Sequence, residues 1–191
     1  MIRTAVARAL SIAGHPAILM PFAVTVAADT RGASPAVLYV AAGATIAVAV
    51  AIAAFSIVQV RSGRWTHVDA SVPSERSQLN VFSAGLLLGA AALLWLNGQP
   101  LALVAGSAIA GALVVLAHLL RAAFKLSLHC AFAVYAASLL SPSVALVAVT
   151  LVLSAAVAWS RLVLRRHTPP EVVSGLLSGA VAGVGFNIIA G

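Results

Sequence analysis

The chain has 191 residues, of which 62% are hydrophobic and only 8% are charged. Soluble domains carry about 25% charged residues, so the composition excludes both a water-soluble enzyme and a disordered chain. Eleven Lys and Arg residues against four Asp and Glu residues give a net charge of +7. In a membrane protein this charge belongs to loops at the bilayer surface and does not indicate nucleic-acid binding.

Seven apolar segments follow one another along the chain and predict seven membrane-spanning helices. They cover residues 9–27, 35–60, 79–96, 101–120, 126–140, 144–160 and 172–190. Most are longer than β-strands and lack alternation, which favours helices over an outer-membrane barrel. The fifth segment is short, so we expect it to be tilted or to begin below the membrane surface, and six spans remain if it does not cross. The predicted fold is an all-α transmembrane helical bundle of six to seven spans, forming one domain over residues 1–191.

The basic residues are distributed unequally between the two ends of this bundle. If every segment spans, the N-terminus and the loops 61–78, 121–125 and 161–171 lie on one side, with ten of the eleven basic residues. The positive-inside rule makes this side cytoplasmic, and we expect a multi-pass protein of a bacterial inner membrane. Three of the five histidines lie in or beside the same loops. We therefore expect any chemistry on this face.

The polar residues of these loops are suited to phosphate chemistry. Arg offers a planar fork for phosphate oxygens, and Lys offers a compact charge. A histidine can act as nucleophile or general acid, and a neighbouring carboxylate fixes its tautomer. The four carboxylates of the chain are isolated from one another, which disfavours a magnesium site. We therefore expect neither a metal nor another cofactor.

Three stretches resemble the signatures of the type 2 phosphatidic acid phosphatases. Residues 160–171, SRLVLRRHTPPE, resemble the third signature (Ser-Arg, five residues, His, three residues, Asp), with Glu171 in place of the aspartate. Residues 125–129, KLSLH, resemble the second signature, Pro-Ser-Gly-His, without its proline and glycine. The first signature is Lys, six residues, Arg-Pro. Here Asp69 stands at the position of the lysine and Arg76-Ser77 at the position of Arg-Pro, so only the arginine is retained. The resemblance covers approximately residues 61–175.

This resemblance implies a metal-independent mechanism with a phosphohistidine intermediate. His167 would attack phosphorus, and Glu171 would orient it. His129 would protonate the leaving oxygen and then activate water. The phosphoryl oxygens would be bound by Arg76, Ser127 and Arg161. Lys125, two residues before Ser127, is our candidate to replace the missing lysine of the first signature.

Several further residues have structural interpretations. Ser127 is expected to cap the helix that begins there, and residues 168–171, TPPE, to form a capping box before the last span. Asp69 is expected to pair with Arg64 or Arg76. Arg165 and Arg166 are interpreted as membrane anchors. The small residues of the last span predict close helix packing: Gly175, Ser178, Gly179 and Gly183.

Two polar residues within the predicted spans, His15 and Cys130, are given no role in the proposed reaction. Pro16 and Pro21 are expected to kink the first span, so His15, which precedes Pro16, is either an interhelical hydrogen-bonding residue or a pocket residue. Cys130 is the only cysteine, which excludes an intramolecular disulfide, and we interpret it as a packing residue.

The sequence thus predicts an integral membrane lipid phosphatase that removes a terminal phosphomonoester or pyrophosphate. Polyprenyl-linked phosphates are the favoured substrates, followed by phosphatidic acid and phosphatidylglycerol phosphate. One alternative is a phosphotransferase on the same scaffold, in which an alcohol replaces water. The other is a non-catalytic lipid-binding protein with a decayed site, because the first and second signatures are altered. The expected partners are membrane lipids, and the sequence does not predict an oligomeric state.

Overall fold

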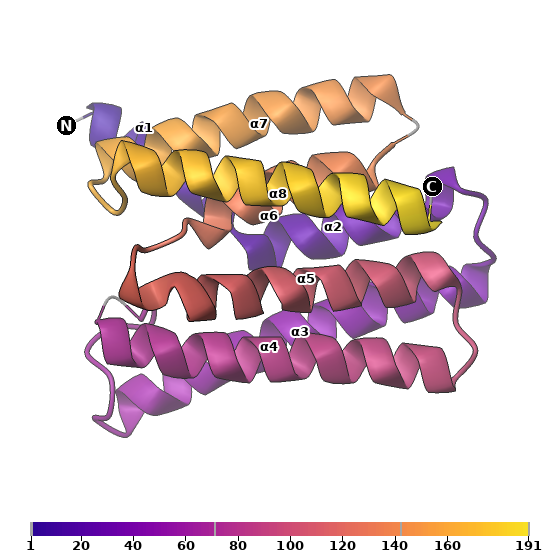
Figure 1. Ribbon diagram of the computed structural model, residues 1–191, viewed down its shortest axis with the longest axis horizontal. Helices are drawn as coiled ribbons and strands as arrows, with labels where there is room; N and C mark the ends of the chain where they lie inside the picture. The colour runs from indigo at the N-terminus through magenta and orange to yellow at the C-terminus, as the bar shows by residue number, and fades with distance from the viewer. Residues whose placement is uncertain (1, 71, 142, 191) are drawn as a thin grey trace.

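The computed structural model describes residues 2–70, 72–141 and 143–190, and these residues form helices and turns without β-strands. The helices are α1 (Ile2–Ala13), α2 (Pro16–Thr30), α3 (Pro35–Arg61), α4 (Pro73–Leu96), α5 (Leu101–Leu119), α6 (Leu128–Leu139), α7 (Val144–Val163) and α8 (Pro169–Ala190), with a short 3₁₀ turn η1 at Leu120–Ala122 (Figure 1). The all-α prediction is confirmed.

Prolines begin several of these helices. Pro16, Pro35, Pro73 and Pro169 stand at the first positions of α2, α3, α4 and α8. Proline is favoured there because its fixed φ suits a helix and its missing N–H would have no intrahelical partner. The local sequence therefore determines where four of the helices start.

Five or six helices could span a membrane, compared with the six to seven spans predicted. Five helices, α3, α4, α5 with η1, α7 and α8, are long and apolar enough to cross a membrane, and α1 with α2 makes six if the bent pair counts as one. The first predicted span, 9–27, is bent as expected from Pro16: α1 and α2 meet at an angle of 47°. The break lies at His15, whose backbone is extended, since a residue before proline is disfavoured in the helical region.

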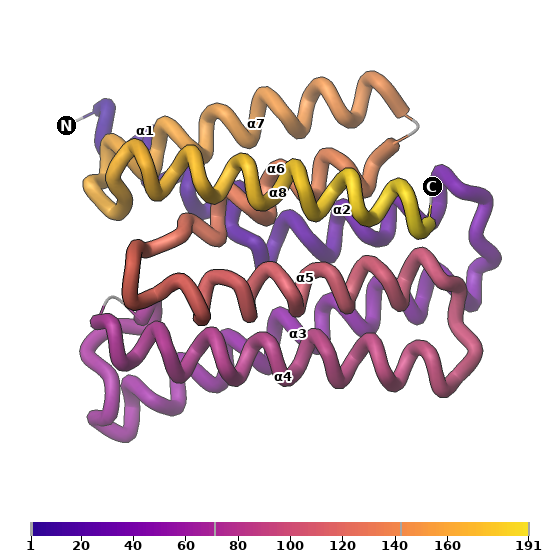
Figure 2. The backbone as a smooth tube through the Cα atoms, viewed as in Figure 1, coloured from indigo at the N-terminus to yellow at the C-terminus, as the bar shows by residue number. Residues whose placement is uncertain are grey.

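The short helix α6 lies in the centre of the bundle. It has 12 residues, most of them buried, and it begins inward from the ends of α5 and α8 (Figure 1). This is the recessed start expected of the fifth segment. The chain still passes from one end of the bundle to the other, so the loops before α4, α6 and α8 share one end (Figure 2). The predicted grouping of these loops is confirmed.

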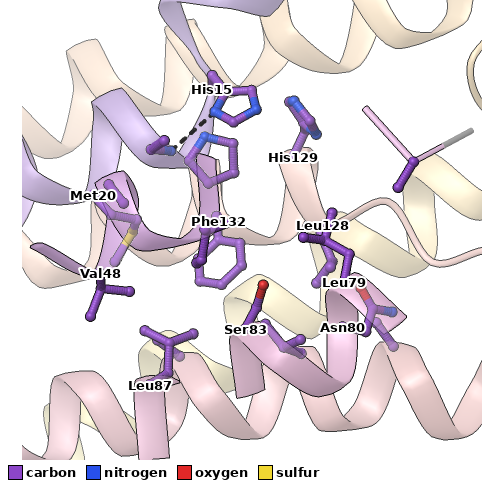
Figure 3. Close-up of a pocket in the computed structure, with 18 of the residues that line it drawn as sticks. His15, Met20, Val48, Leu79, Asn80, Ser83, Leu87, Leu128, His129 and Phe132 are labelled. Carbon is purple, nitrogen blue, oxygen red and sulfur yellow. Dashed lines mark hydrogen bonds between the residues drawn. The ribbon is translucent and has the colours of Figure 1, made fainter. Parts of the chain in front are cut away.

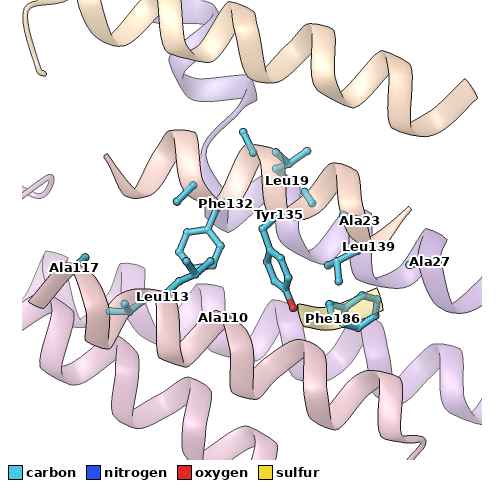
Figure 4. Close-up of a cluster of buried hydrophobic side chains, with 14 of the residues drawn as sticks. Leu19, Ala23, Ala27, Ala110, Leu113, Ala117, Phe132, Tyr135, Leu139 and Phe186 are labelled. Atoms are coloured by element: carbon cyan, nitrogen blue, oxygen red, sulfur yellow. The ribbon is translucent and has the colours of Figure 1, made fainter. Parts of the chain in front are cut away.

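Aromatic side chains and alanines fill the core around α6. Tyr135 is fully buried, and its hydroxyl donates a hydrogen bond to the Gly106 carbonyl of α5 at 3.0 Å. Its ring meets Phe186 of α8 edge to face, with 6.3 Å between the ring centroids. Phe132 lies one turn before Tyr135 in the same cluster (Figure 4). These contacts join α6 to α5 and α8.

Helices α6 and α8 pack closely through a row of glycines. A Cβ atom on Gly175 would overlap the Ser127 carbonyl, one on Gly179 would overlap the Ala131 carbonyl, and one on Gly183 would overlap the Ser138 hydroxyl. The Ser127 N–H also donates to the Glu171 carbonyl at 3.2 Å. The predicted close packing of the last span is confirmed, and it fixes the start of α6 against the start of α8.

We predict that Gly179→Ala destabilises the protein by about 1–3 kcal/mol, because its new methyl group would meet rigid backbone. Gly185→Ala, on the same helix with open space around it, is the matched control and should melt at or slightly above the wild-type temperature, since alanine favours helices. Thermal unfolding in detergent, followed by circular dichroism, measures both. Equal melting temperatures for the two variants would contradict the close contact.

Candidate functional site

A cavity of about 690 Å³ lies between α2, α3, α4, α5 and α6 (Figure 3). Its lining begins at the end of the bundle that holds the basic loops and reaches Leu94 and Leu103, near the opposite ends of α4 and α5. Five cations line it: Arg76, Arg121, Lys125, Arg161 and Arg166. Three histidines line it as well: His15, His129 and His167. The cavity is therefore cationic at its mouth and apolar in its depth.

His167 and Glu171 form a hydrogen-bonded pair at the start of α8. The Nδ1 atom of His167 lies 3.1 Å from Oε2 of Glu171, and the His167 side chain is only 5% exposed. The same carboxylate oxygen accepts the Thr168 backbone N–H at 3.0 Å. This second contact is one of the two hydrogen bonds of the predicted capping box, the one in which the Glu171 carboxylate accepts from the backbone of Thr168. Glu171 therefore caps α8 and holds His167 at the same time.

The environment of His167 favours an uncharged ring. Burial lowers the pKa of His167 below its ordinary value of 6.5, the cations Lys125 and Arg161 lower it further, and Glu171 opposes them. At neutral pH the contact with Glu171 is therefore a hydrogen bond from neutral imidazole, although its distance also fits an ion pair. Because Nδ1–H donates to the carboxylate, Nε2 keeps its lone pair. A nitrogen with a free lone pair can act as a nucleophile or a base.

Lys125 connects two of the converging loops. Its Nζ donates to the Arg166 carbonyl at 2.9 Å. Burial lowers the pKa of Lys125, as do the neighbouring charges of Arg76, Arg161 and Arg166, whereas Glu171 raises it. The mutual repulsion of these cations makes the position attractive to an anion.

Arg161, in the last turn of α7, is held in part by the N-terminal helix. Its Nη1 donates to the Ser11 hydroxyl of α1 at 2.8 Å. Its Nε is buried and has no hydrogen-bond partner among the residues that the structure describes. The guanidinium is thus fixed in place and retains an N–H donor for a further acceptor.

His129 and His15 face each other across the cavity wall. Their rings meet edge to face with 4.9 Å between centroids, and both line the cavity (Figure 3). Nδ1 of His15 accepts the Ala17 backbone N–H at 3.2 Å, so the neutral ring carries its proton on Nε2. Of the two interpretations of His15, the structure supports the pocket residue, and the His-Pro break within the first span was the signal for it.

Ser127 does not reach the cavity. Its side chain is fully buried, and its hydroxyl donates to Sγ of Cys130 at 3.3 Å. It occupies the N-cap position of α6 but makes no side-chain cap bond, so the expected capping is wrong. The close approach of α8 at Gly175 covers this residue. Among the sequence-predicted phosphate-binding residues, the structure brings together Arg76, Lys125 and Arg161.

The partner predicted for Asp69 is also wrong. Asp69 pairs with Arg166 at 2.8 Å, and both side chains are about half exposed. Arg166 lines the cavity, although we interpreted it as a membrane anchor. Its position directly before His167 was the available signal. Arg165 is exposed and does not line the cavity.

No family model, curated protein or solved structure matches the chain. Within residues 2–70, 72–141 and 143–190, no group of three or more His, Cys, Asp or Glu side chains could hold a metal ion. The length and composition of its helices indicate a multi-pass membrane protein. Its candidate site is the cavity of about 690 Å³ with cations and histidines at the mouth.

We predict that His167 titrates below the ordinary value of 6.5 and that Lys125→Met raises its midpoint, since Lys125 is the first of the charges that lower its pKa. The measurement is an NMR pH titration of histidine-labelled protein in detergent, assigned with His167→Ala. Arg165→Met removes an equal charge outside the cavity and should leave the midpoint unchanged. A midpoint at or above 6.5, or an equal response to both variants, would contradict the arrangement.

Proposed function

We propose that this protein is an integral membrane lipid phosphatase that removes a terminal phosphate from a lipid through His167. The observation that carries the proposal is the neutral His167, held by Glu171 at 3.1 Å, at the cationic mouth of an otherwise apolar cavity. A lipid phosphate has the same division into an anionic head and a hydrocarbon tail. The signatures that resemble the type 2 phosphatidic acid phosphatases support the same conclusion.

The proposed reaction has two steps at phosphorus. In the first, Nε2 of His167 attacks phosphorus, the bond to the lipid oxygen breaks, and His129 gives that oxygen a proton. In the second, His129 takes a proton from water, the water oxygen attacks phosphorus, and the phosphorus–nitrogen bond breaks. Inorganic phosphate and a lipid alcohol are the products. Glu171 keeps Nδ1 protonated throughout and stabilises the positive charge that develops on the ring.

The surrounding cations bind the phosphoryl group. Arg76, Lys125 and Arg161 are the proposed ligands of its oxygens, and Arg166 adds a fourth charge at the mouth. Donors that are already fixed in place stabilise a transition state without reorganisation. Arg161, held by Ser11, and Lys125, held by the Arg166 carbonyl, meet this condition.

The proposed orientation follows from the distribution of charge. The basic loops lie at the end of the bundle where the cavity mouth is found, and the positive-inside rule assigns such an end to the cytoplasm. The substrate would therefore enter from the cytoplasmic leaflet, with its tail between the helices. This placement favours a biosynthetic step over recycling on the outer face.

We predict that the purified protein releases phosphate from lipid phosphates and that chelators do not reduce the rate of release. His167→Ala should lower this rate at least about 1,000-fold, as expected for loss of a nucleophile. His67→Ala is the matched control, because His67 lies in a converging loop but does not line the cavity. It should retain wild-type activity. The proposal fails if folded wild-type protein releases no phosphate, if a chelator abolishes release, or if His167→Ala remains active.

A further inference from the structure

A polar stripe continues from the cavity mouth down one face of α4. Arg76, Asn80 and Ser83 are spaced four and three residues apart, so they lie on the same side of the helix, and all three line the cavity. At 1.5 Å per residue, Asn80 lies about 6 Å and Ser83 about 10 Å below Arg76 along the helix axis. Figure 3 shows both side chains on the α4 side of the cavity, with the Ser83 hydroxyl directed inward.

The two deeper side chains of this stripe are largely buried, and their polar atoms face the cavity without a partner in the protein. Asn80 is 5% exposed and Ser83 is 7% exposed, and neither side chain has a hydrogen-bond partner among the described residues. The other hydroxyls of the deep lining are satisfied: Thr45 donates to the Ala41 carbonyl at 2.7 Å, and Ser107 donates to the Leu87 carbonyl at 2.8 Å. The polar atoms of Asn80 and Ser83 are not among the fully enclosed atoms without a partner, so they are open to the cavity. Both groups are therefore free to donate hydrogen bonds to a ligand with acceptors at that depth.

We propose that Asn80 and Ser83 form a carbonyl-binding subsite that recognises the ester groups of a glycerolipid phosphate. The inference rests on the proposed function, which places the phosphate at Arg76. In such a lipid the ester carbonyls follow the phosphate after a few covalent bonds, within reach of the Asn80 amide and the Ser83 hydroxyl. Both groups are donors, and a carbonyl oxygen accepts from either.

The lining below Ser83 suits the acyl chains. The same helix continues toward the far end of the cavity with the apolar residues Leu87, Ala90 and Leu94. Val48 of α3 lies opposite, and Figure 3 labels both Leu87 and Val48. A polyprenyl phosphate presents hydrocarbon directly below its phosphate. It would cover Asn80 and Ser83 without offering them an acceptor, which costs free energy. The proposed subsite therefore favours a glycerolipid phosphate over the polyprenyl phosphate that the sequence suggested.

The test compares three substrates in mixed micelles of the full chain: a diacyl glycerol phosphate, the dialkyl ether of equal chain length, and a polyprenyl phosphate. We expect kcat/KM for the diacyl lipid to exceed that for each of the others at least about tenfold, because each lacks the carbonyl acceptors. Ser83→Ala and Asn80→Leu should bring the diacyl-to-dialkyl ratio close to one. Ser107→Ala, the matched control, should preserve the ratio because that hydroxyl is already bonded to the backbone.

Binding gives a second readout that does not require turnover. Native mass spectrometry of the His167→Ala variant should show retention of the diacyl lipid in preference to the dialkyl lipid, and Ser83→Ala in the same background should abolish the preference. Equal hydrolysis of all three lipids would overturn the subsite and leave the proposed phosphatase intact. If no lipid is hydrolysed, the phosphatase proposal fails. A preference for the diacyl lipid in the binding experiment would then still support the subsite. Equal binding of the lipids, or no binding, would overturn the subsite as well.

Discussion

Helices α6 and α8 approach so closely that the positions of Gly175, Gly179 and Gly183 admit no side chain. In a membrane, where apolar burial gives little net attraction between helices, such close packing is a principal source of helix association. The contact also has a chemical consequence. The N–H of Ser127 bonds to the carbonyl of Glu171, so the start of the helix that carries His129 is fixed to the start of the helix that orients His167.

The remaining parts of the site depend on this frame. Lys125 lies just before α6, and its bond to the Arg166 carbonyl ties the loop before α6 to the loop before α8. The cations that meet there repel one another, and an isolated cluster of this kind would be unstable in a partly buried place. Here backbone carbonyls, the Ser11 hydroxyl and the Asp69 carboxylate hold individual members of the cluster. The arrangement is therefore prepared for an anion before any anion arrives, which lowers the cost of binding it.

Much of the fold could be predicted from the sequence, because apolar length and proline position are local properties. Pro35 begins a predicted segment and Pro169 lies in the predicted capping box, and the structure starts α3 and α8 at these residues. Helix α4 begins at Pro73, six residues before the predicted segment 79–96. The bend at His15 could be predicted from Pro16, although the apolar run continues through it, because proline kinks a helix and disfavours helical backbone at the residue before it. The short α6 was anticipated from its length. These two elements explain why the structure has five or six possible spans where the sequence predicts six to seven.

Contacts of the candidate site could be predicted where they lie within one turn of a helix. They could not be predicted where they depend on how distant parts of the chain pack. The pairing of His167 with Glu171 follows from a separation of four residues, which places them one turn apart. The burial of Ser127 depends on how closely α8 approaches, and the pairing of Asp69 with Arg166 depends on where two distant loops meet. Neither could be derived from the sequence, and neither could the depth at which Asn80 and Ser83 face the cavity.

The central claim is that His167 becomes covalently phosphorylated. The most direct measurement uses the His129→Ala variant with an alkyl-substituted nitrophenyl phosphate. The leaving group of this substrate needs no protonation, so the first step proceeds without His129. Hydrolysis of the phosphohistidine is slowed, because His129 is no longer present to activate water. Peptide mass spectrometry after a rapid alkaline quench should then find a phosphoryl group on His167, and none should be found when His167 is also replaced by alanine. Turnover of this substrate by the wild-type protein, with no phosphoryl group on His167 in the variant, would contradict the account.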